Sequence, residues 1–355
     1  MPNEPITAAF IVLNSVFTFN NPLVGKMICT IYMRKSVICS QSYRCCLDDP
    51  LSEMLALLKP ESYITAGFDA GGSWALLLDD LAGRIKCYAV LRGECWLAME
   101  GFEAVQLKAG ECFVLPTGRP AVIASDLNAE PKRASETLAP DRSGGTVVYN
   151  GGGDVFLVGS RFEVNGRHAE LMLQALPSLI RVEASDDRAK LRLFIELMMN
   201  ELREPRPGAF HIAQNLSHMM LAQALRLFLE NAPEGTVGWF TALADPRLAL
   251  SIRAIHSNPS RPWTLEELAR IAGMSRTSFA NHFRDRVGET PISYLARWRM
   301  MTAAAKLVEG RETMADISAS LGYASEQAFN TAFKRIMGQS PRQYAKAERL
   351  RAMSR

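Results

Sequence analysis

An internal repeat in the last hundred residues constrains the fold more than any other feature of this sequence. Five positions recur 50 residues later: Phe279, Phe283, Gly288, Pro291 and Tyr294 correspond to Phe329, Phe333, Gly338, Pro341 and Tyr344. A fixed offset of this kind indicates two copies of one supersecondary unit. We expect each copy, at about 263–288 and 313–338, to contain two helices joined by a short turn.

The first copy carries the local signals of a helix-turn-helix. Thr264 and Glu267 have the spacing of a capping box, which begins a helix. Gly273 is suited to ending that helix, and Ser275 to capping the next one. Because Phe279 is followed by a second phenylalanine four residues later, both side chains lie on one face of the second helix.

The segment between the copies is predicted to be a linker helix over 290–309. Thr290 is a favourable N-cap, Pro291 suits the first helical position, and Gly310 follows the end. Nineteen helical residues span about 28 Å. Two second helices held that far apart can enter successive major grooves of a DNA duplex, which lie about 34 Å apart.

Charge is distributed unevenly along the chain. Residues 245–355 carry a net charge of +8, whereas residues 1–244 carry −5. A basic domain attached to an acidic one indicates a polyanionic partner for the basic part. Charge alone does not separate nucleic acid from other acidic partners.

The face opposite the phenylalanines is the one that DNA would meet. Asn and Gln side chains pair with adenine, Arg pairs with guanine, Glu accepts from cytosine, and Thr or Ala methyl groups contact thymine. We predict base reading by Arg276, Thr277, Ala280, Asn281, Glu326, Gln327, Asn330 and Thr331. We predict phosphate contacts by Arg284, Arg297, Arg299, Lys334 and Arg335. The alternative is that these residues are ordinary solvated helix faces, but two copies at a fixed offset in the only basic third of the chain favour DNA.

The N-terminal part has a different character. Short runs rich in Val, Leu, Tyr, Trp and Phe are separated by glycine turns, which predicts a β-sandwich or barrel over 48–164. Apolar residues at helical spacing then predict helices over 165–232, whose apolar faces would pack on each other, on the sandwich or on a second subunit. Residues 233–244 are rich in Pro and Gly and are predicted to be a linker.

Residues 1–47 match no downstream pattern, and we expect them to be a non-native or disordered extension, with translation starting at Met27, Met33 or Met54. The longest apolar run near the start is too short for a membrane span, and no signal peptide is apparent. Seven cysteines without Cys-x-x-Cys spacing favour reduced thiols in a cytoplasmic protein.

The segment WTLEELARIAGMSRTSFANHFRDRVGETPISYLARWRMMTAAAKLV, followed by MADISASLGYASEQAFNTAFKRIMGQSPRQY, resembles the DNA-binding domain of AraC/XylS-type bacterial transcription regulators over about 100 residues. The resemblance implies a monomeric domain that binds promoter DNA and most often activates transcription through contact with RNA polymerase. It also implies base-reading positions at Thr277, Ala280, Asn281, Glu326, Gln327 and Asn330. Because Thr277 and Ala280 are small, they would read less than longer side chains.

The β-rich part resembles the cupin-like N-terminal domain of one AraC subgroup. Metal-dependent cupins bind their ion with histidines and a glutamate, yet this part contains no histidine before His168, so we expect no catalytic metal and no cofactor. A small-molecule effector pocket is predicted from Trp74, Tyr88, Trp96, Phe113 and Arg119. The alternative is that these side chains fill a core.

The sequence therefore predicts an α+β chain with a cupin-like N-terminal domain, following helices suited to homodimerisation, and an all-α double helix-turn-helix domain. The predicted function is a cytoplasmic transcription regulator that binds promoter DNA, responds to an effector, contacts RNA polymerase as an activator and has no enzymatic activity. One alternative is a metal-free cupin isomerase or lyase fused to a DNA-binding domain. Another is a constitutive DNA-binding protein whose sandwich only dimerises.

Overall fold

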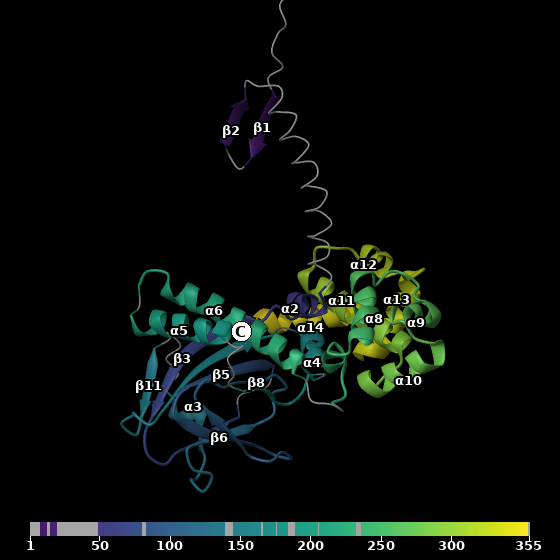
Figure 1. The fold of residues 1–355 in the computed structure, drawn as a ribbon. Coiled ribbons are helices and arrows are strands. Elements are labelled where there is room, and N and C mark those ends of the chain that lie inside the picture. Colours follow the sequence, from purple (N-terminus) through teal and green to yellow (C-terminus); the bar gives the residue numbers. More distant parts are fainter. Residues whose placement is uncertain are drawn as a thin grey trace, which may run out of the picture.

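The computed structural model describes residues 8–12, 15–19, 49–79, 83–138, 145–164, 166–174, 176–183, 189–204, 206–231 and 236–353 (Figure 1). The strands are β1 (Ala8–Val12), β2 (Ser15–Phe19), β3 (Glu61–Ala70), β4 (Ala75–Leu78), β5 (Arg84–Arg92), β6 (Glu94–Met99), β7 (Val105–Lys108), β8 (Cys112–Leu115), β9 (Ala121–Ala124), β10 (Lys132–Arg133), β11 (Thr146–Tyr149), β12 (Val155–Glu163) and β13 (Ile180–Val182). The helices are α2 (Pro50–Leu58), α3 (Ala134–Thr137), α4 (Arg167–Gln174), α5 (Ala189–Arg203), α6 (Ala209–Glu230), α7 (Trp239–Ala242), α8 (Pro246–Ser257), α9 (Leu265–Ile271), α10 (Arg276–Val287), α11 (Pro291–Glu309), α12 (Met314–Ser320), α13 (Glu326–Met337) and α14 (Pro341–Met353).

Near the start of the chain, β1 and β2 pair antiparallel. The rest of 1–47, and with it the prediction of a non-native or disordered extension, lies outside the described residues.

Two separate sheets form the N-terminal domain, which we define as residues 49–231. One has the strand order β10-β4-β9-β6-β7, and the other has the order β11-β3-β12-β5-β8-β13. The second sheet is covered on its other face by α5 and α6, so the domain has three layers (Figure 1). The structure is thus a sandwich, and the barrel that the sequence left open is not formed.

Alternating side chains on β5 explain why the sheet between the two other layers is apolar on both faces. Cys87 and Ala89 contact the helical layer, whereas Tyr88 and Val90 face the other sheet. Successive strand residues point to opposite faces, and a sheet covered on both sides needs apolar residues at both sets of positions.

Over its described residues, the predicted helical region 165–232 contains a strand as well as helices. After α4, the chain returns to the sandwich as β13, which pairs antiparallel with β8. The two long helices α5 and α6 pack on each other and on the six-stranded sheet, so the sandwich is their main partner. Of the described helices, none has the length and apolar character needed to cross a membrane.

The predicted linker at 233–244 is packed rather than extended over its described part. Trp239 and Phe240 of α7 are 1% and 0% exposed, and Phe240 stacks on Phe228 of α6 with ring centroids 6.2 Å apart. The Gly238 backbone N–H donates to the Arg286 carbonyl oxygen over 2.8 Å, which joins this segment to α10. Pro and Gly content alone did not reveal that the two aromatic residues would be buried.

Helices α9 and α10 form the first helix-turn-helix unit and α12 and α13 form the second, and local signals set the ends of these helices. Thr264 caps α9 and Thr313 caps α12, each in a capping box with the acidic residue three positions later. Ser275 and Ser325 cap α10 and α13 by accepting backbone hydrogen bonds. The linker helix α11 has Thr290 as its N-cap and ends at Gly310, whose φ is +65°.

Each unit is organised around an equivalent set of aromatic rings. Phe283 of α10 meets Tyr294 of α11 with centroids 5.7 Å apart, and Phe333 of α13 meets Tyr344 of α14 at 5.6 Å. The first unit shares its apolar cluster with α2, α7 and the helices of the N-terminal domain. The second unit has a separate cluster built around Phe329 and Phe333.

We expect Phe283→Ala and Phe333→Ala each to lower the free energy of unfolding by about 3–5 kcal/mol, because each removes a fully buried ring and leaves a cavity. Thermal and urea unfolding followed by circular dichroism measure this loss. Phe102→Ala, at a ring that is 48% exposed, is the control and should change stability little. Unchanged unfolding of both buried variants would contradict the repeat as the basis of the two cores.

Candidate DNA-binding surface

Helix α10 presents a polar face away from the core of the first unit. Phe279 and Phe283 are 0% exposed, whereas Arg276, Thr277 and Asn281 on the other side are exposed. Arg284 is also exposed, and Ala280 is half-buried at the edge of this face. The structure therefore brings the predicted residues of the first unit together on one surface, with Ala280 least accessible.

Arg276 is held only loosely on this surface. Its Nη1 lies 2.9 Å from Oε1 of Glu266 on α9, and both side chains are more than half exposed. An ion pair this exposed contributes between zero and about 1 kcal/mol, so a base or a phosphate can replace Glu266 as its partner.

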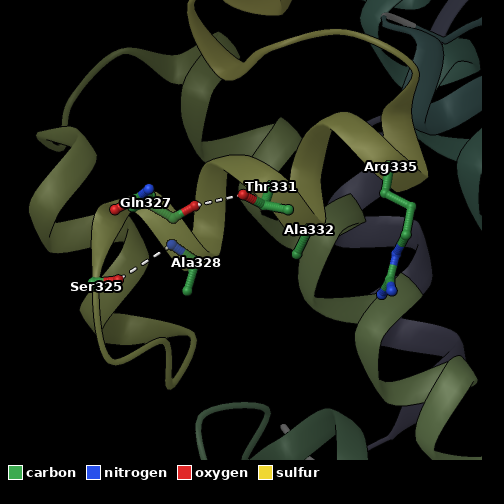
Figure 2. Close-up of a pocket in the computed structure, with 6 residues that line it drawn as sticks. All are labelled: Ser325, Gln327, Ala328, Thr331, Ala332 and Arg335. Carbon is green, nitrogen blue, oxygen red and sulfur yellow. Dashed lines mark hydrogen bonds between the residues drawn. The ribbon is translucent and has the colours of Figure 1, made fainter.

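Helix α13 presents the matching surface of the second unit. Glu326, Gln327, Asn330 and Thr331 are exposed, as are Lys334 and Arg335. The Thr331 hydroxyl donates to the Gln327 carbonyl oxygen over 2.9 Å, which fixes that side chain along the helix (Figure 2). That bond uses the Gln327 backbone, so the side-chain amide of Gln327 remains available for an external partner.

A shallow cleft of about 500 Å³ follows this face of α13. Figure 2 shows Gln327, Thr331 and Arg335 along successive turns of the helix, with the small side chains of Ala328 and Ala332 between them. The two alanines were not among the residues predicted for the site. Their signal in the sequence is the four-residue spacing that places both on this same face.

Two arginines predicted to contact phosphate are engaged inside the protein. Both Nε and Nη2 of Arg297 contact the Glu289 carboxylate, at 2.7 and 2.5 Å. Arg299 donates from Nε to the Pro259 carbonyl oxygen over 2.5 Å and from Nη2 to the Arg261 carbonyl oxygen over 2.9 Å, and burial lowers its pKa. These arginines fix the linker helix against neighbouring segments, and a phosphate would have to displace those partners.

His282 connects α10 to the start of α8. Its Nε2 lies 2.5 Å from Oδ2 of Asp245, whose other carboxylate oxygen accepts from the N–H groups of Arg247 and Leu248. Burial opposes ionisation of Asp245, but these hydrogen bonds outweigh it and lower its pKa. The carboxylate therefore stays charged and anchors α10.

The equivalent tyrosines of the two units each contact a buried histidine. In the first unit, the Tyr294 hydroxyl lies 2.7 Å from Nε2 of His256, whose Nδ1 is 2.9 Å from Oε2 of Glu53 on α2. Burial lowers the pKa of His256 well below its usual value, so the ring is neutral near pH 7. This contact joins the N-terminal domain to the linker helix.

In the second unit the histidine itself belongs to the N-terminal domain. The Tyr344 hydroxyl accepts from the His168 backbone N–H over 3.1 Å and lies 2.8 Å from its Nδ1. One turn along α14, a Glu348 carboxylate oxygen accepts from the Arg167 N–H over 3.4 Å. The Tyr294 hydroxyl thus reaches α2 through His256, whereas the repeat-equivalent Tyr344 hydroxyl contacts α4 directly.

The predicted pocket residues of the sandwich divide into three places. Trp74 and Phe113 are buried between the sheets, and Tyr88 stacks on Phe113 with centroids 5.1 Å apart. Trp96 alternates with the buried Cys95 and Leu97 on β6, so it lies on the outer face and does not share that interior. Arg119 is exposed and lies over the Phe102 ring at 5.5 Å.

Trp74 carries an unpaired polar atom in this interior. Its side chain is 2% exposed, and its Nε1–H has no hydrogen-bond acceptor among the described residues. The described part of the chain contains no group of three or more His, Cys, Asp or Glu side chains placed to hold a metal.

Comparisons with known proteins agree with this architecture. A family model described as a cupin matches residues 49–230, and one described as a helix-turn-helix domain matches residues 268–347. Together they define a DNA-binding regulator with a cupin domain. A putative AraC-like transcription regulator from Streptomyces lividans is 39% identical over 302 residues, which cover 84% of this chain and 98% of that protein. The chain belongs to the AraC-like transcription regulators, and the predicted family and fold class are confirmed.

Two further matches have lower sequence identity. The transcriptional regulator AlkR from Acinetobacter baylyi is 28% identical over 284 residues, covering 77% of this chain and 91% of that protein. A crystal structure of ToxT from Vibrio cholerae with an unsaturated fatty acid bound covers 79% of this chain and 93% of its own, at 12% identity and a TM-score of 0.32. A score this low supports no conclusion about this chain.

Acidification should weaken the contact between α4 and α14. Burial lowers the pKa of His168 from 6.5 to about 4, so the unfolded chain binds the extra proton first and stability falls as the pH drops from 6.5 toward 4. Between pH 7.5 and pH 5 we expect this group to account for a loss of about 2 kcal/mol. Urea unfolding at both pH values measures it. His168→Gln should remove that part of the pH dependence, and an equal dependence in wild type and variant would contradict it.

Proposed function

We propose that the two helix-turn-helix units read promoter DNA with the exposed faces of α10 and α13. The observation that carries this proposal is the duplicated pattern of a buried phenylalanine pair and an opposite polar face. Such a face fits the major groove, where amide and guanidinium groups recognise purine edges. The proposed base-reading residues are Arg276, Thr277, Ala280, Asn281, Glu326, Gln327, Asn330 and Thr331.

Fewer residues are proposed to contact phosphate than the sequence alone predicts. Arg284, Lys334 and Arg335 are exposed beside the two reading faces. We leave out Arg297 and Arg299, because their donors already have partners within the protein. Phosphate contacts fix position and do not discriminate among sequences.

We infer that the cupin domain responds to a small effector between its sheets. The buried Trp74 indole N–H, which has no acceptor in the part of the chain that the structure describes, supports this, because an unpaired buried donor costs about 1–3 kcal/mol that a ligand acceptor would recover. The regulator acts in the cytoplasm, and contact of the DNA-bound protein with RNA polymerase activates transcription.

A homodimer would form through the outer surface of α5 and α6. Leu193 and Leu197 lie one turn apart on α5 and are 50% and 42% exposed, and Ile212 and Met219 lie two turns apart on α6 and are 44% and 48% exposed. Apolar side chains grouped in this way on a surface are typical of protein interfaces.

Base and phosphate contacts predict different mutant behaviour. We expect Gln327→Ala to weaken binding to the preferred site by about 1–3 kcal/mol and to relax preference at particular base pairs. Arg335→Ala should weaken binding to all DNA sequences alike and reduce the salt dependence of binding. Fluorescence anisotropy of the full chain on the DNA upstream of its own gene, across a salt series, measures both.

The control for these variants is Arg226→Ala, which removes an exposed cation of α6 far along the chain from both units. Equal and sequence-independent losses from Gln327→Ala and Arg335→Ala would show that α13 does not read bases. Unchanged affinity in both variants would show that α13 does not face DNA.

Leu193→Glu combined with Leu197→Glu tests the dimer. We expect a shift from dimer to monomer in sedimentation velocity, because two carboxylates cannot be buried unpaired in an apolar interface. Val148→Glu, at an exposed residue of β11, is the matched control and should leave the dimer intact. A wild-type monomer at micromolar concentration would refute the interface.

A further inference from the structure

A second cleft lies in the DNA-binding half, away from the reading face of α13. It is about 410 Å³ in volume and lies between the end of α11, the start of α12 and one side of α14. It shares no lining residue with the cleft along α13. Its volume falls within the range of small-molecule sites.

The inner surface of this cleft is apolar. Leu307 is 6% exposed, Met314 and Ala345 are half-buried, and Leu350 stands at the edge with 57% of its surface exposed. A side chain as exposed as Leu350 gains from covering by an apolar group. The cleft can therefore hold a ligand with an apolar body.

Three cations line one side of the cleft. Arg342, Lys346 and Arg349 follow one another along a single face of α14 and span about 10 Å. All three are exposed, and none makes a hydrogen bond or an ion pair with another described residue.

Glu312, the acidic residue among the described residues that line the cleft, does not cancel these charges. The Glu312 carboxylate lies 3.0 Å from Nζ of Lys306, which already neutralises it. At Gly310, a side chain would begin 3.0 Å from Nη2 of Arg349, so the bare turn lets that guanidinium lie at the mouth of the cleft. The cleft therefore offers a net positive edge above an apolar floor.

We propose that this cleft binds an organic anion with an apolar body, such as an aromatic or medium-chain carboxylate. The carboxylate pairs with the cations of α14, and a guanidinium can bind it through two parallel hydrogen bonds. The apolar body covers Leu307, Met314 and Leu350. A DNA backbone would satisfy the cations but leave the apolar floor unused, which is why the chemistry favours a small amphipathic anion.

Occupation of the cleft has a consequence for the second unit. The ligand contacts both α12 and α14, and both of these helices pack against α13. By holding α12 and α14 together, the ligand stabilises the two helices against which α13 packs. This ligand site is separate from the proposed DNA-reading faces and the proposed effector site between the sheets. Binding of the anion can therefore be measured without DNA.

Isothermal titration calorimetry of the full chain tests the site with three probes. The first, 1-naphthoate, has both the charge and the apolar body; 1-naphthamide lacks the charge, and acetate lacks the body. We expect binding of 1-naphthoate alone. Arg342→Ala and Arg349→Ala should each weaken it by about tenfold, since a hydrogen bond between charged groups contributes about that much.

Leu350→Asp should also abolish binding, whereas Arg226→Ala on α6 should not change it. All of these side chains are exposed, so circular dichroism melting should be unaltered in every variant. No binding of 1-naphthoate at millimolar concentration overturns the proposal. Binding of 1-naphthoate that survives the α14 substitutions also overturns the proposal, because the ligand then occupies another site. A loss of DNA affinity in Arg342→Ala, without any binding of 1-naphthoate to the wild-type chain, overturns it as well.

Discussion

Burial of aromatic rings between the two halves of the chain is the interaction on which the rest of the structure depends. The His256 ring lies flat on Trp298 with centroids 3.5 Å apart, and Trp239 lies beside it at 6.1 Å. Trp239 and Trp298 belong to one apolar cluster that runs from α2 and α6 through α7 to α10 and α11. The first helix-turn-helix unit therefore completes its core with residues of the N-terminal domain.

The two units differ in how they join that domain. The first is held by a large apolar contact, while the second has its own core and meets α4 through Leu171, the Tyr344 hydroxyl and the Glu348 carboxylate, a contact that is more polar than that of the first. Polar contacts at a domain boundary exchange readily with water, whereas apolar burial does not. A change within the N-terminal domain can consequently reorient the second unit with less loss of stability than reorienting the first unit would cause.

The repeat was the most predictable part of the fold, because its signals are local. Capping residues, the glycine after each helix and the paired phenylalanines act within a few positions of one another. The burial of Trp239 and the return of the chain as β13 depend on partners far along the chain, and composition around them indicated a linker and a helix. For the candidate site, the sequence identified the exposed faces of α10 and α13. It did not reveal that Arg297 and Arg299 have internal partners, since these come from segments 8 and 40 residues away.

The shared aromatic cluster also determines where this protein can be divided. A fragment that begins at Asp245 would lack Trp239 and Phe240, and the side of α10 that they cover would face water. Such a fragment would be prone to self-association, which would appear as apparent cooperativity in any binding curve measured with it. A fragment that starts at Thr236 keeps both rings and still leaves out the sandwich.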